Sequence, residues 1–501
     1  MSQIQEHLPV LQVVIPLVAA PICVLLRKSS VVWLFALAVT WISCAISGSL
    51  LMQVLQSESG YISYMIGNWV APLGIEYRID AVNAFVLLIV TGVGSVVLLY
   101  APKSVGHEIP EEHHHYLYSA FLLCMTGLLG ITTTGDAFNV FVFLEISSLS
   151  SYALIALGRS RKALTAAFQY LIMGTIGGTF ILIGIGFIYM KTGTLNMEDL
   201  TVRIGKLLQG NSIPPTVLIS FAFIIVGMSI KLAFFPLHLW LPNAYTYAPS
   251  VVTSFIAATA TKVSLYMMLR FTFSIYNIKN IPGVSKVSTI MMSLALVAIF
   301  VASTVAIYQS NIKRMLAYSS IAQIGYMVLG MSLFTAEGLT AGILHMFNHA
   351  LMKAALFMAL GCVFMRLGSV ELKDMKGIGK QMPMTMFAFV MGGLSLIGVP
   401  LTVGFISKWH LMLAVIKSHQ WPIAIMLLIS SLLAVIYIWR VVEVAYFQEP
   451  EEGQVVVKEA PLSMLLPTWI LIGANIYFGI STKITVTSAQ QAANLLSGGT
   501  P

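Results

Sequence analysis

Long apolar runs follow one another along almost the whole chain, and short polar segments separate them. A helix needs about 20 mostly apolar residues to cross a bilayer. The pattern therefore predicts an all-α integral membrane protein with fourteen transmembrane helices, numbered here as spans 1 to 14. The predicted spans cover residues 8–26, 31–54, 81–101, 116–133, 135–157, 164–190, 217–247, 250–274, 286–308, 315–335, 338–365, 384–416, 421–447 and 461–481.

Two longer connections have distinct patterns. Residues 55–79 are mixed in polarity and contain three glycines and a proline, which indicates an extramembrane loop or hairpin. Residues 191–213 include the amphipathic stretch MEDLTVRIGKLL, which predicts a short helix.

Composition supports a lipid-embedded protein. Of the 501 residues, 58% are hydrophobic and 9% are charged, against roughly 25% charged residues in an ordinary soluble domain. The predicted partner of most of the surface is therefore the lipid bilayer, and no nucleic acid is expected. The first apolar run has no basic segment before it and no small-residue cleavage site, so it is predicted to be a retained span.

Lysine and arginine are shared unequally between the two sets of connections. Connections after odd-numbered spans carry thirteen of these residues, and Arg440, at a helix end that faces the same side, makes fourteen. They are Arg27, Lys28, Lys103, Arg159, Arg161, Lys162, Lys313, Arg314, Arg366, Lys373, Lys376, Lys380, Arg440 and Lys458. The other connections carry seven: Arg78, Lys191, Arg203, Lys206, Lys279, Lys286 and Lys417. Basic residues accumulate on the cytoplasmic side of membrane proteins. The bias predicts that both termini of this multi-pass protein lie on the outer side. The expected membrane is the bacterial plasma (inner) membrane.

Apart from residues near the ends of spans (Asp136, Arg270, Lys286, Arg440 and Glu443), five charged residues remain inside the predicted spans: Glu145, Lys231, Lys262, Lys353 and Lys408. A charged side chain at the centre of a membrane helix costs roughly 2.5–3.5 kcal/mol. Five unpaired groups would cost on the order of 12 kcal/mol, so the set indicates a proton pathway. The alternative for any single residue is a snorkelling or salt-bridged structural side chain.

Helix-breaking residues accompany two of these lysines. Lys231 lies five residues before Pro236 in span 7, and Gly398 and Pro400 precede Lys408 in span 12. Broken membrane helices that recur in corresponding positions indicate an inverted repeat around an ion site. We expect two inverted five-helix repeats, spans 4–8 and 9–13; the alternative is a proline-kinked helix with a lysine nearby by chance. The expected parts are 1–110 (spans 1–3), 111–275 (first repeat), 286–447 (second repeat) and 448–501 (a C-terminal loop and span 14).

Span 11 places His345, His349 and Lys353 at i, i+4 and i+8, on one helix face. Histidines titrate near neutrality and are suited to relaying protons. Two alternatives are structural histidines with satisfied hydrogen bonds, and a zinc pair. No carboxylate or cysteine accompanies the histidines at a ligand spacing, so no metal site is predicted. The four cysteines lie in apolar runs and no cofactor motif is present, so no cofactor is expected.

Three weaker candidates remain. His238, just after Pro236, is a possible extension of the pathway. Asp80 begins span 3 and is either a possible site residue or a helix cap. His113 to His115 lie beside Glu108 in a connection and are interpreted as part of a solvated cytoplasmic segment.

Six segments of this sequence resemble an antiporter-like family, which comprises large membrane subunits of respiratory complex I, Mrp cation/proton antiporters and membrane-bound hydrogenases. The resemblance covers about spans 4 to 13. The segments are FVFLEISSLSSYALI, KLAFFPLHLWLPNAYTYAPS, TKVSLYMMLR, KRMLAYSSIAQIGY, LHMFNHALMKAALF and GFISKW. The resemblance implies that Glu145 and Lys231 form a modulating ion pair and that Lys262 is a central proton site.

The same resemblance implies that His345 and His349 belong to the pathway and that Lys408 is its last site toward the outside. Lysine at both Lys262 and Lys408 looks most like the D-type member of the Mrp antiporters, or its relative in hydrogenases. Asn243 stands where many members have an acidic residue, which weakens any uptake route assigned near it.

The predicted function is that of a proton-translocating membrane subunit of a multisubunit monovalent cation (Na⁺)/H⁺ antiporter, working with other membrane subunits. Such a subunit is not an enzyme, and no catalytic residue is predicted. A second interpretation is a non-redox, proton-pumping subunit of a complex I-type or hydrogenase complex. A third is a scaffold subunit whose charges have no transport role. The sequence has no obvious oxygen-rich sodium site, so any sodium path is expected to involve another subunit.

Overall fold

Helices form throughout the apolar runs, because a chain surrounded by hydrocarbon must pair its backbone groups within each segment. The computed structural model describes residues 3–208, 214–281, 283–450 and 456–498. Within these residues, 12 helices are long and apolar enough to cross a membrane. Two of the fourteen predicted spans, 315–335 and 384–416, are not among these 12 helices. The helix in the first contains several polar residues, and the second consists of two helices shorter than 18 residues.

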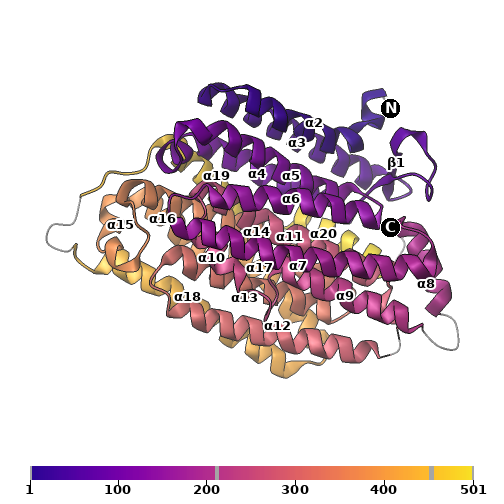
Figure 1. The fold of residues 1–501 in the computed structure, drawn as a ribbon. Helices are drawn as coiled ribbons and strands as arrows, with labels where there is room; N and C mark the ends of the chain where they lie inside the picture. Colours follow the sequence, from indigo (N-terminus) through magenta and orange to yellow (C-terminus); the bar gives the residue numbers. More distant parts are fainter. Residues whose placement is uncertain (1–2, 209–213, 282, 451–455, 499–501) are drawn as a thin grey trace.

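The helices run side by side in one bundle (Figure 1). The N-terminal part consists of α1 (Gln3–Glu6), α2 (Leu8–Leu25), α3 (Ser29–Gln56), β1 (Tyr61–Met65), η1 (Ile66–Asn68), β2 (Glu76–Asp80), α4 (Ala81–Glu108) and η2 (Glu111–His113). The next part consists of α5 (His114–Thr133), α6 (Ala137–Ala156), α7 (Arg161–Thr192), α8 (Met197–Leu208), α9 (Pro215–Leu232), α10 (Trp240–Tyr247), α11 (Ser250–Leu269), η3 (Arg270–Ile275) and η4 (Ile278–Asn280). The last part consists of α12 (Val284–Ile307), α13 (Ile312–Ser332), α14 (Ala336–Leu367), η5 (Leu372–Met375), α15 (Ile378–Gln381), α16 (Pro383–Ile397), α17 (Val403–Lys417), α18 (Trp421–Phe447), α19 (Leu462–Ile480) and α20 (Lys483–Leu496).

The two long polar connections are ordered elements. The first is a hairpin in which β1 pairs antiparallel with β2, with Tyr61 opposite Asp80 and Met65 opposite Glu76. The second contains α8, whose sequence is the stretch MEDLTVRIGKLL. In α8 the residues Leu200 and Ile204 are buried, as expected when apolar residues recur on one face of a surface helix.

Two spans are interrupted beside a lysine. Residues 233–239 separate α9 from α10, and residues 398–402 separate α16 from α17. Pro236 and Pro400 lie in these breaks, where a residue without a backbone donor cannot continue the helix. Lys231 is in the last turn of α9, and Lys408 is in α17 just beyond the second break.

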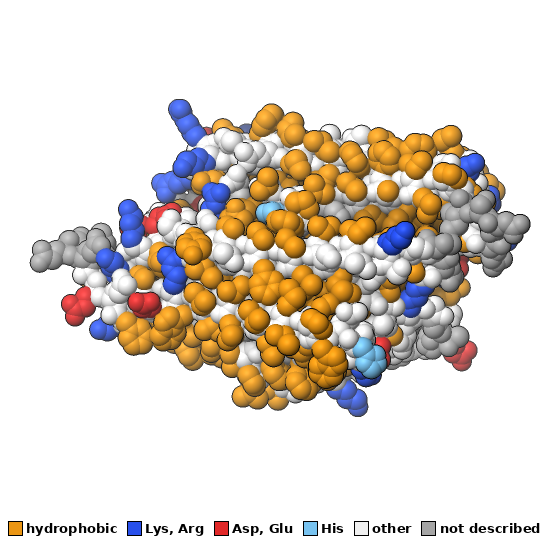
Figure 2. Space-filling view, turned by 90° about the horizontal axis from the view of Figure 1, so that it is seen from below, with side chains coloured by type: hydrophobic (Ala, Val, Ile, Leu, Met, Phe, Trp, Pro, Cys, Tyr) orange, Lys and Arg blue, Asp and Glu red, His pale blue; other side chains and the backbone are white. Residues whose placement is uncertain are grey.

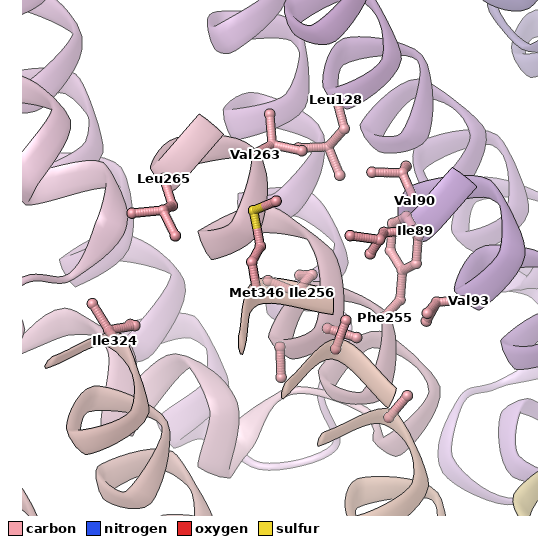
Figure 3. Close-up of a cluster of buried hydrophobic side chains, with 14 of the residues drawn as sticks. Ile89, Val90, Val93, Leu128, Phe255, Ile256, Val263, Leu265, Ile324 and Met346 are labelled. Carbon is pink, nitrogen blue, oxygen red and sulfur yellow. The ribbon is translucent and has the colours of Figure 1, made fainter. Parts of the chain in front are cut away.

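The helices α4, α5, α11 and α14 form the centre of the bundle. The apolar part of the helical stretch Ser250–Ile275, which contains α11, is 94% buried, that of Glu111–Thr133, which contains α5, is 83% buried, and those of α4 and α14 are 78% buried. The corresponding value is 39% for the peripheral helices α2, α3, α7, α12 and α18. Figure 3 shows apolar side chains converging on α11 from its neighbours, including Val93 of α4, Leu128 of α5 and Met346 of α14. Any polar group on α11 is therefore held in an apolar protein interior.

Charged side chains gather toward the two ends of the bundle, and hydrophobic side chains cover much of the middle of the face in Figure 2. In that view lysine and arginine are more numerous at the left end, where Figure 1 places α15. Both ends of the chain lie toward the opposite end, which also carries β1 and α8 (Figure 1). This arrangement is the one expected when alternate connections face opposite sides of a membrane.

One helix was not predicted. The sequence predicts a loop and one span for residues 448–501, but the structure adds α20 after α19. The sequence of α20, KITVTSAQQAANLL, mixes polar and apolar residues and contains no long apolar run, so hydropathy does not predict it. Ala489, Ala492 and Ala493 are fully buried, and their small side chains allow α20 to pack against α4 and α14.

The helices α7 and α9 approach closely through glycines. A methyl group at Gly227 would lie 2.6 Å from the carbonyl oxygen of Gly177, and one at Gly184 would overlap the side chain of Ile224. Small residues permit such close packing between membrane helices. Gly186 of α7 has no atom within 4 Å of the corresponding position.

We expect Gly227→Val to destabilise the protein by about 1–3 kcal/mol, because the added side chain must push α9 away from α7. The measurement is the thermal unfolding midpoint in detergent. Gly186→Val is the matched control and should unfold close to the wild-type temperature. Equal midpoints for Gly227→Val and the wild type would contradict this packing.

Candidate functional site

The first charged pair joins α6 to α9. The Lys231 ammonium nitrogen lies 3.6 Å from Oε1 of Glu145 and donates a hydrogen bond of 2.8 Å to Oγ of Ser148. Lys231 is buried, whereas the Glu145 side chain is 27% exposed. The sequence predicts Glu145 as a charged group inside a span, but in the structure its side chain is only partly buried. A methyl group at Gly178 of α7 would overlap the same carboxylate oxygen, so this glycine makes room for the pair.

A small polar cavity lies between Lys231 and α11. It has a volume of about 20 Å³ and is lined by Ser148, Ser151 and Ser264 among others. A water molecule needs roughly 10–15 Å³ of such space and two to four polar partners. The cavity therefore has the size and polarity to hold one water. The apolar side chains of Leu128 and Val263, which lie close together in Figure 3, also line it.

Lys262 is fully buried in the middle of α11. Its ammonium nitrogen donates to the carbonyl oxygen of Ala257 and, at 3.4 Å, to Oγ1 of Thr261. Both partners are neutral. The side chain turns back along its own helix, as lysine side chains on helices generally do.

The sequence predicts one face of α14 that carries His345, His349 and Lys353. All three side chains are buried in the structure. Nδ1 of His345 lies 2.8 Å from Oγ of Ser407 and its Nε2 lies 2.8 Å from Oε1 of Gln323. The rings of His345 and His349 are nearly parallel, with centroids 6.1 Å apart. Both ring nitrogens of His349 are buried, and neither has a hydrogen-bond partner among the described residues. An imidazole in this state has unused capacity to donate and accept a proton.

Lys353 continues this face toward α13. Its ammonium nitrogen donates to the carbonyl oxygen of Leu316 at 2.8 Å and to Oγ of Ser319. Lys262 and Lys353 both interact electrostatically with His349 and with each other. The central group of the site therefore consists of Lys262, His349 and Lys353.

These groups form a row that begins with Glu145 and Lys231 and continues through the central group and His345. Lys408 lies at its other end. Its ammonium nitrogen donates to the carbonyl oxygens of Leu396 and Ile397 at 3.1 and 2.9 Å, next to the break in span 12. These carbonyls end α16 and have no helical donor, so the break supplies the lysine with acceptors. The same nitrogen lies 4.9 Å from the ring centroid of Tyr326, which in turn lies 5.7 Å from the His345 ring.

A groove of about 570 Å³ between α17 and α18 reaches Lys408. Its walls are mainly apolar and include Trp409, Trp421 and Leu428, all of which are exposed. Lys408 is half-buried, so this end of the row is less enclosed than Lys262 and Lys353.

The two remaining candidates lie apart from the row. His238 is buried in the break of span 7, where its ring stacks on Phe235 and its Nδ1 has no hydrogen-bond partner. Asp80 caps α4, where it accepts from the backbone amides of Val82 and Asn83, and it pairs with Arg270 at 2.8 Å. Burial alone would raise the pKa of Asp80, but the Arg270 guanidinium and these amides hold that pKa below its ordinary value. These contacts make Asp80 an anchor between α4 and η3.

Among the described residues, no group of three or more His, Cys, Asp or Glu side chains could hold a metal ion. Other polar side chains at the row were not predicted: Gln323, Ser407 and Tyr326. They belong to ordinary helical sequence, and only the packing of α13 and α17 against α14 brings them to the histidines.

The arrangement is a row of titratable and hydroxyl-bearing groups across the bundle. It runs from Glu145 at the perimeter through Lys231, the central group and His345 to Lys408. Several neighbours lie within hydrogen-bond or electrostatic range, and the cavity beside Lys231 has room for one water. Such a row can move charge from helix to helix without a cofactor.

Comparison with known proteins gives a consistent result. The family described as NADH:quinone oxidoreductase/Mrp antiporter, TM, matches residues 134–434. NADH-quinone oxidoreductase subunit N of Desulforudis audaxviator (strain MP104C) is 39% identical over 502 residues, covering 97% of this chain and 98% of that protein. The D-type Na⁺/H⁺ antiporter subunit of Alkalihalophilus pseudofirmus is 29% identical over 493 residues, covering 98% and 97%.

A solved structure has the same fold. A chain of the membrane-bound sulfane sulfur reductase, an archaeal respiratory membrane complex, matches with a TM-score of 0.89 and 31% identity, covering 98% of each chain.

We expect Gly178→Ala to lower the rate of proton transport by roughly tenfold, equivalent to about 1.4 kcal/mol in activation free energy. The added methyl group displaces the Glu145 carboxylate from Lys231 while both charges remain. Proton transport in membrane vesicles is the measurement. Gly186→Ala on the same helix is the control, since its methyl group meets open space. Wild-type transport in Gly178→Ala would show that the position of the carboxylate is unimportant.

Proposed function

The chain belongs to the NADH:quinone oxidoreductase/Mrp antiporter membrane family, and from that membership we propose that it is a proton-translocating subunit of a multisubunit membrane complex. The observation that carries the proposal is the row of buried ionisable groups, above all the Glu145–Lys231 pair and the central group Lys262, His349 and Lys353. Charged groups held inside membrane helices are costly and are retained where they transfer ions or protons.

The proposed mechanism is electrostatic. While Glu145 stays beside Lys231, its negative charge stabilises the ammonium form of that lysine. When the pair separates, Lys231 loses this stabilisation. It then passes its proton toward Lys262 or, while still charged, repels a positive charge on Lys262. The change then passes through His349 and His345 to Lys408. The breaks next to Lys231 and Lys408 allow these two ends of the row to move.

The first candidate assembly is a monovalent cation/proton antiporter, in which Na⁺ or a similar cation is exchanged for protons. The full-length similarity to a D-type Na⁺/H⁺ antiporter subunit supports this candidate, as does lysine at both Lys262 and Lys408. In such a complex the chain handles protons, and the cation path involves other membrane subunits.

The second candidate is a redox-driven complex that uses the same subunit as a non-redox proton pump. A specific observation favours it: the identity to a NADH-quinone oxidoreductase subunit N, 39%, exceeds the 29% identity to the antiporter subunit. The matching sulfane sulfur reductase is also a respiratory complex. Electrons would then be carried by other subunits.

We also propose the finer architecture. It comprises fourteen spans, with spans 4–8 and 9–13 as inverted repeats in the parts 111–275 and 286–447, and with 1–110 and 448–501 as flanking parts. The two interrupted spans, each with a lysine beside the break, support the repeat. The uneven distribution of basic residues supports both termini on the outer side of a bacterial inner membrane.

We expect Glu145→Ala, Lys231→Ala and Lys262→Ala each to lower proton transport by roughly a hundredfold, in line with the loss of a positioned proton-transfer group. Transport is measured in everted vesicles, and assembly of the complex is followed on native gels. Lys103→Ala is the control, because Lys103 is exposed. Assembled variants with normal transport would favour the scaffold interpretation instead.

The two candidate assemblies predict different companions. Gentle purification of the tagged chain from its native membrane should recover other membrane subunits, which mass spectrometry identifies. Cation-antiporter subunits, together with Na⁺-dependent proton movement, would establish the first candidate. Iron–sulfur, flavin or nickel proteins, together with proton movement that requires an electron donor, would establish the second. Recovery of the chain as an isolated, active protein would contradict both.

A further inference from the structure

A polar pocket opens at the end of the bundle opposite the chain ends, away from the row. It has a volume of about 220 Å³. Residues in and next to five connections line the pocket. The distribution of basic residues assigns all five connections to the cytoplasmic side. The lining includes Glu108, Arg159, Thr246, Lys313 and Glu371.

Two charged residues at the floor of the pocket are buried. Glu108 is 8% exposed and Lys313 is 3% exposed. The sequence predicts both in connections, with Glu108 beside a solvated segment, because both lie just outside the apolar runs. In the structure Glu108 is the last residue of α4 and Lys313 is the second residue of α13, and both turn inward.

Both residues converge on the first residue of α11. Oε2 of Glu108 accepts from the backbone amide of Ser250 at 2.9 Å, and Oε1 accepts from Oγ of Ser104 at 2.9 Å. The Lys313 ammonium nitrogen donates to Oγ of Ser250 at 3.0 Å.

From Ser250, hydroxyl groups lead along α11 toward Lys262. Ser250 and Ser254 are four residues apart and share one helix face, and Lys262 follows eight residues later, about 80° further around the helix. Ser254 Oγ donates to the carbonyl oxygen of Ser250 at 2.8 Å, and both serines are fully buried. The Lys262 side chain turns back to the carbonyl of Ala257. Ala257 follows Ser254 by three positions, an axial rise of about 4.5 Å, so a route from the Ser254 hydroxyl to Lys262 needs a water molecule between them.

We propose that the pocket is the proton-uptake site of this chain, with Glu108 as the acceptor and the Ser250–Ser254 face of α11 as the route to Lys262. The proposal rests on the proposed function, since it needs Lys262 to accept a proton. A proton from water in the pocket binds the Glu108 carboxylate to form the acid. Each hydroxyl or water along the route accepts one proton and gives up another. Glu108 returns to the carboxylate, and the Lys262 amine becomes an ammonium.

Lys313 acts as a positioning residue in this scheme. Its hydrogen bond to Ser250 holds the hydroxyl at the end of the route, and its positive charge stabilises Glu108 after the proton leaves. Other ionisable groups surround the carboxyl group from the packed elements. They are Arg159 and Glu371 at the rim, Tyr100 and Cys362 beneath, and His107 and His114, whose ring nitrogens lie within hydrogen-bond distance of the carbonyls of Met365 and Ile109.

A purely structural role for Glu108 is the competing explanation, because its carboxylate caps the N-terminus of α11. Glu108→Gln separates the two. The amide oxygen can still accept from Ser250, so the cap is kept, but the side chain cannot carry a proton at neutral pH.

The experiment measures initial rates of proton transport by the whole complex in inside-out vesicles, over a range of medium pH from acidic to alkaline. Under the proposed orientation the pocket faces the medium. We expect Glu108→Gln to lower the rate by at least about tenfold on the alkaline side and by much less on the acidic side, where a high proton concentration compensates for the missing acceptor. Glu112→Gln is the control, since that carboxylate is at the same end of the bundle and its side chain is 77% exposed.

Ser254→Ala provides a second test should Glu108→Gln fail to assemble, and it should show the same loss confined to alkaline medium. A rate that falls equally at every pH, or an unchanged profile in either assembled variant, would overturn the uptake site. Lys262→Ala keeps this outcome distinct from failure of the proposed function. Loss of transport in Lys262→Ala with a wild-type profile in Glu108→Gln refutes only the uptake site. Normal transport in Lys262→Ala refutes the proposed function itself.

Discussion

The organisation of this protein depends on how lysine charges are accommodated where there is almost no counter-charge. In the described part of the chain, the row contains one ion pair, Glu145–Lys231. Lys262, Lys353 and Lys408 are held by backbone carbonyls and hydroxyl groups. A cation with neutral acceptors in a poorly polarisable interior is sensitive to every charge near it. The proton affinity of each lysine is therefore governed by the state of its neighbours, which is the property that a relay requires.

Some of these ionisable groups lie on a rigid helix and others lie beside breaks where the backbone can adjust. His345, His349 and Lys353 belong to the uninterrupted 32-residue helix α14, so their spacing along the helix is fixed. Lys231 and Lys408 lie next to breaks, where freed carbonyls and prolines replace regular hydrogen bonding. A change in the first ion pair can thus alter the ends of the row while the middle keeps its geometry.

Much of this structure could be predicted from sequence, because hydropathy, proline positions and the i, i+4 rule report local properties. The spans, the short helix α8, both breaks and the face of α14 follow from such patterns. The rest depends on tertiary packing. The burial of Glu108 and Lys313 arises because the ends of α4 and α13 tuck under α11, although both residues lie outside the apolar runs. Gln323 and Tyr326 join the site only through packing between helices. The helix α20 has too few apolar residues for a hydropathy signal.

The partial exposure of Glu145 has a consequence for any measurement on the isolated chain. Its carboxylate belongs to the main ion pair, yet 27% of the side chain faces whatever covers the bundle at that point. The attraction between two charges varies inversely with the polarisability of the medium around them. Lipid tails, a detergent belt or a neighbouring polypeptide will each give the pair a different strength. Titration of the purified protein therefore describes its solvent as well as its sequence.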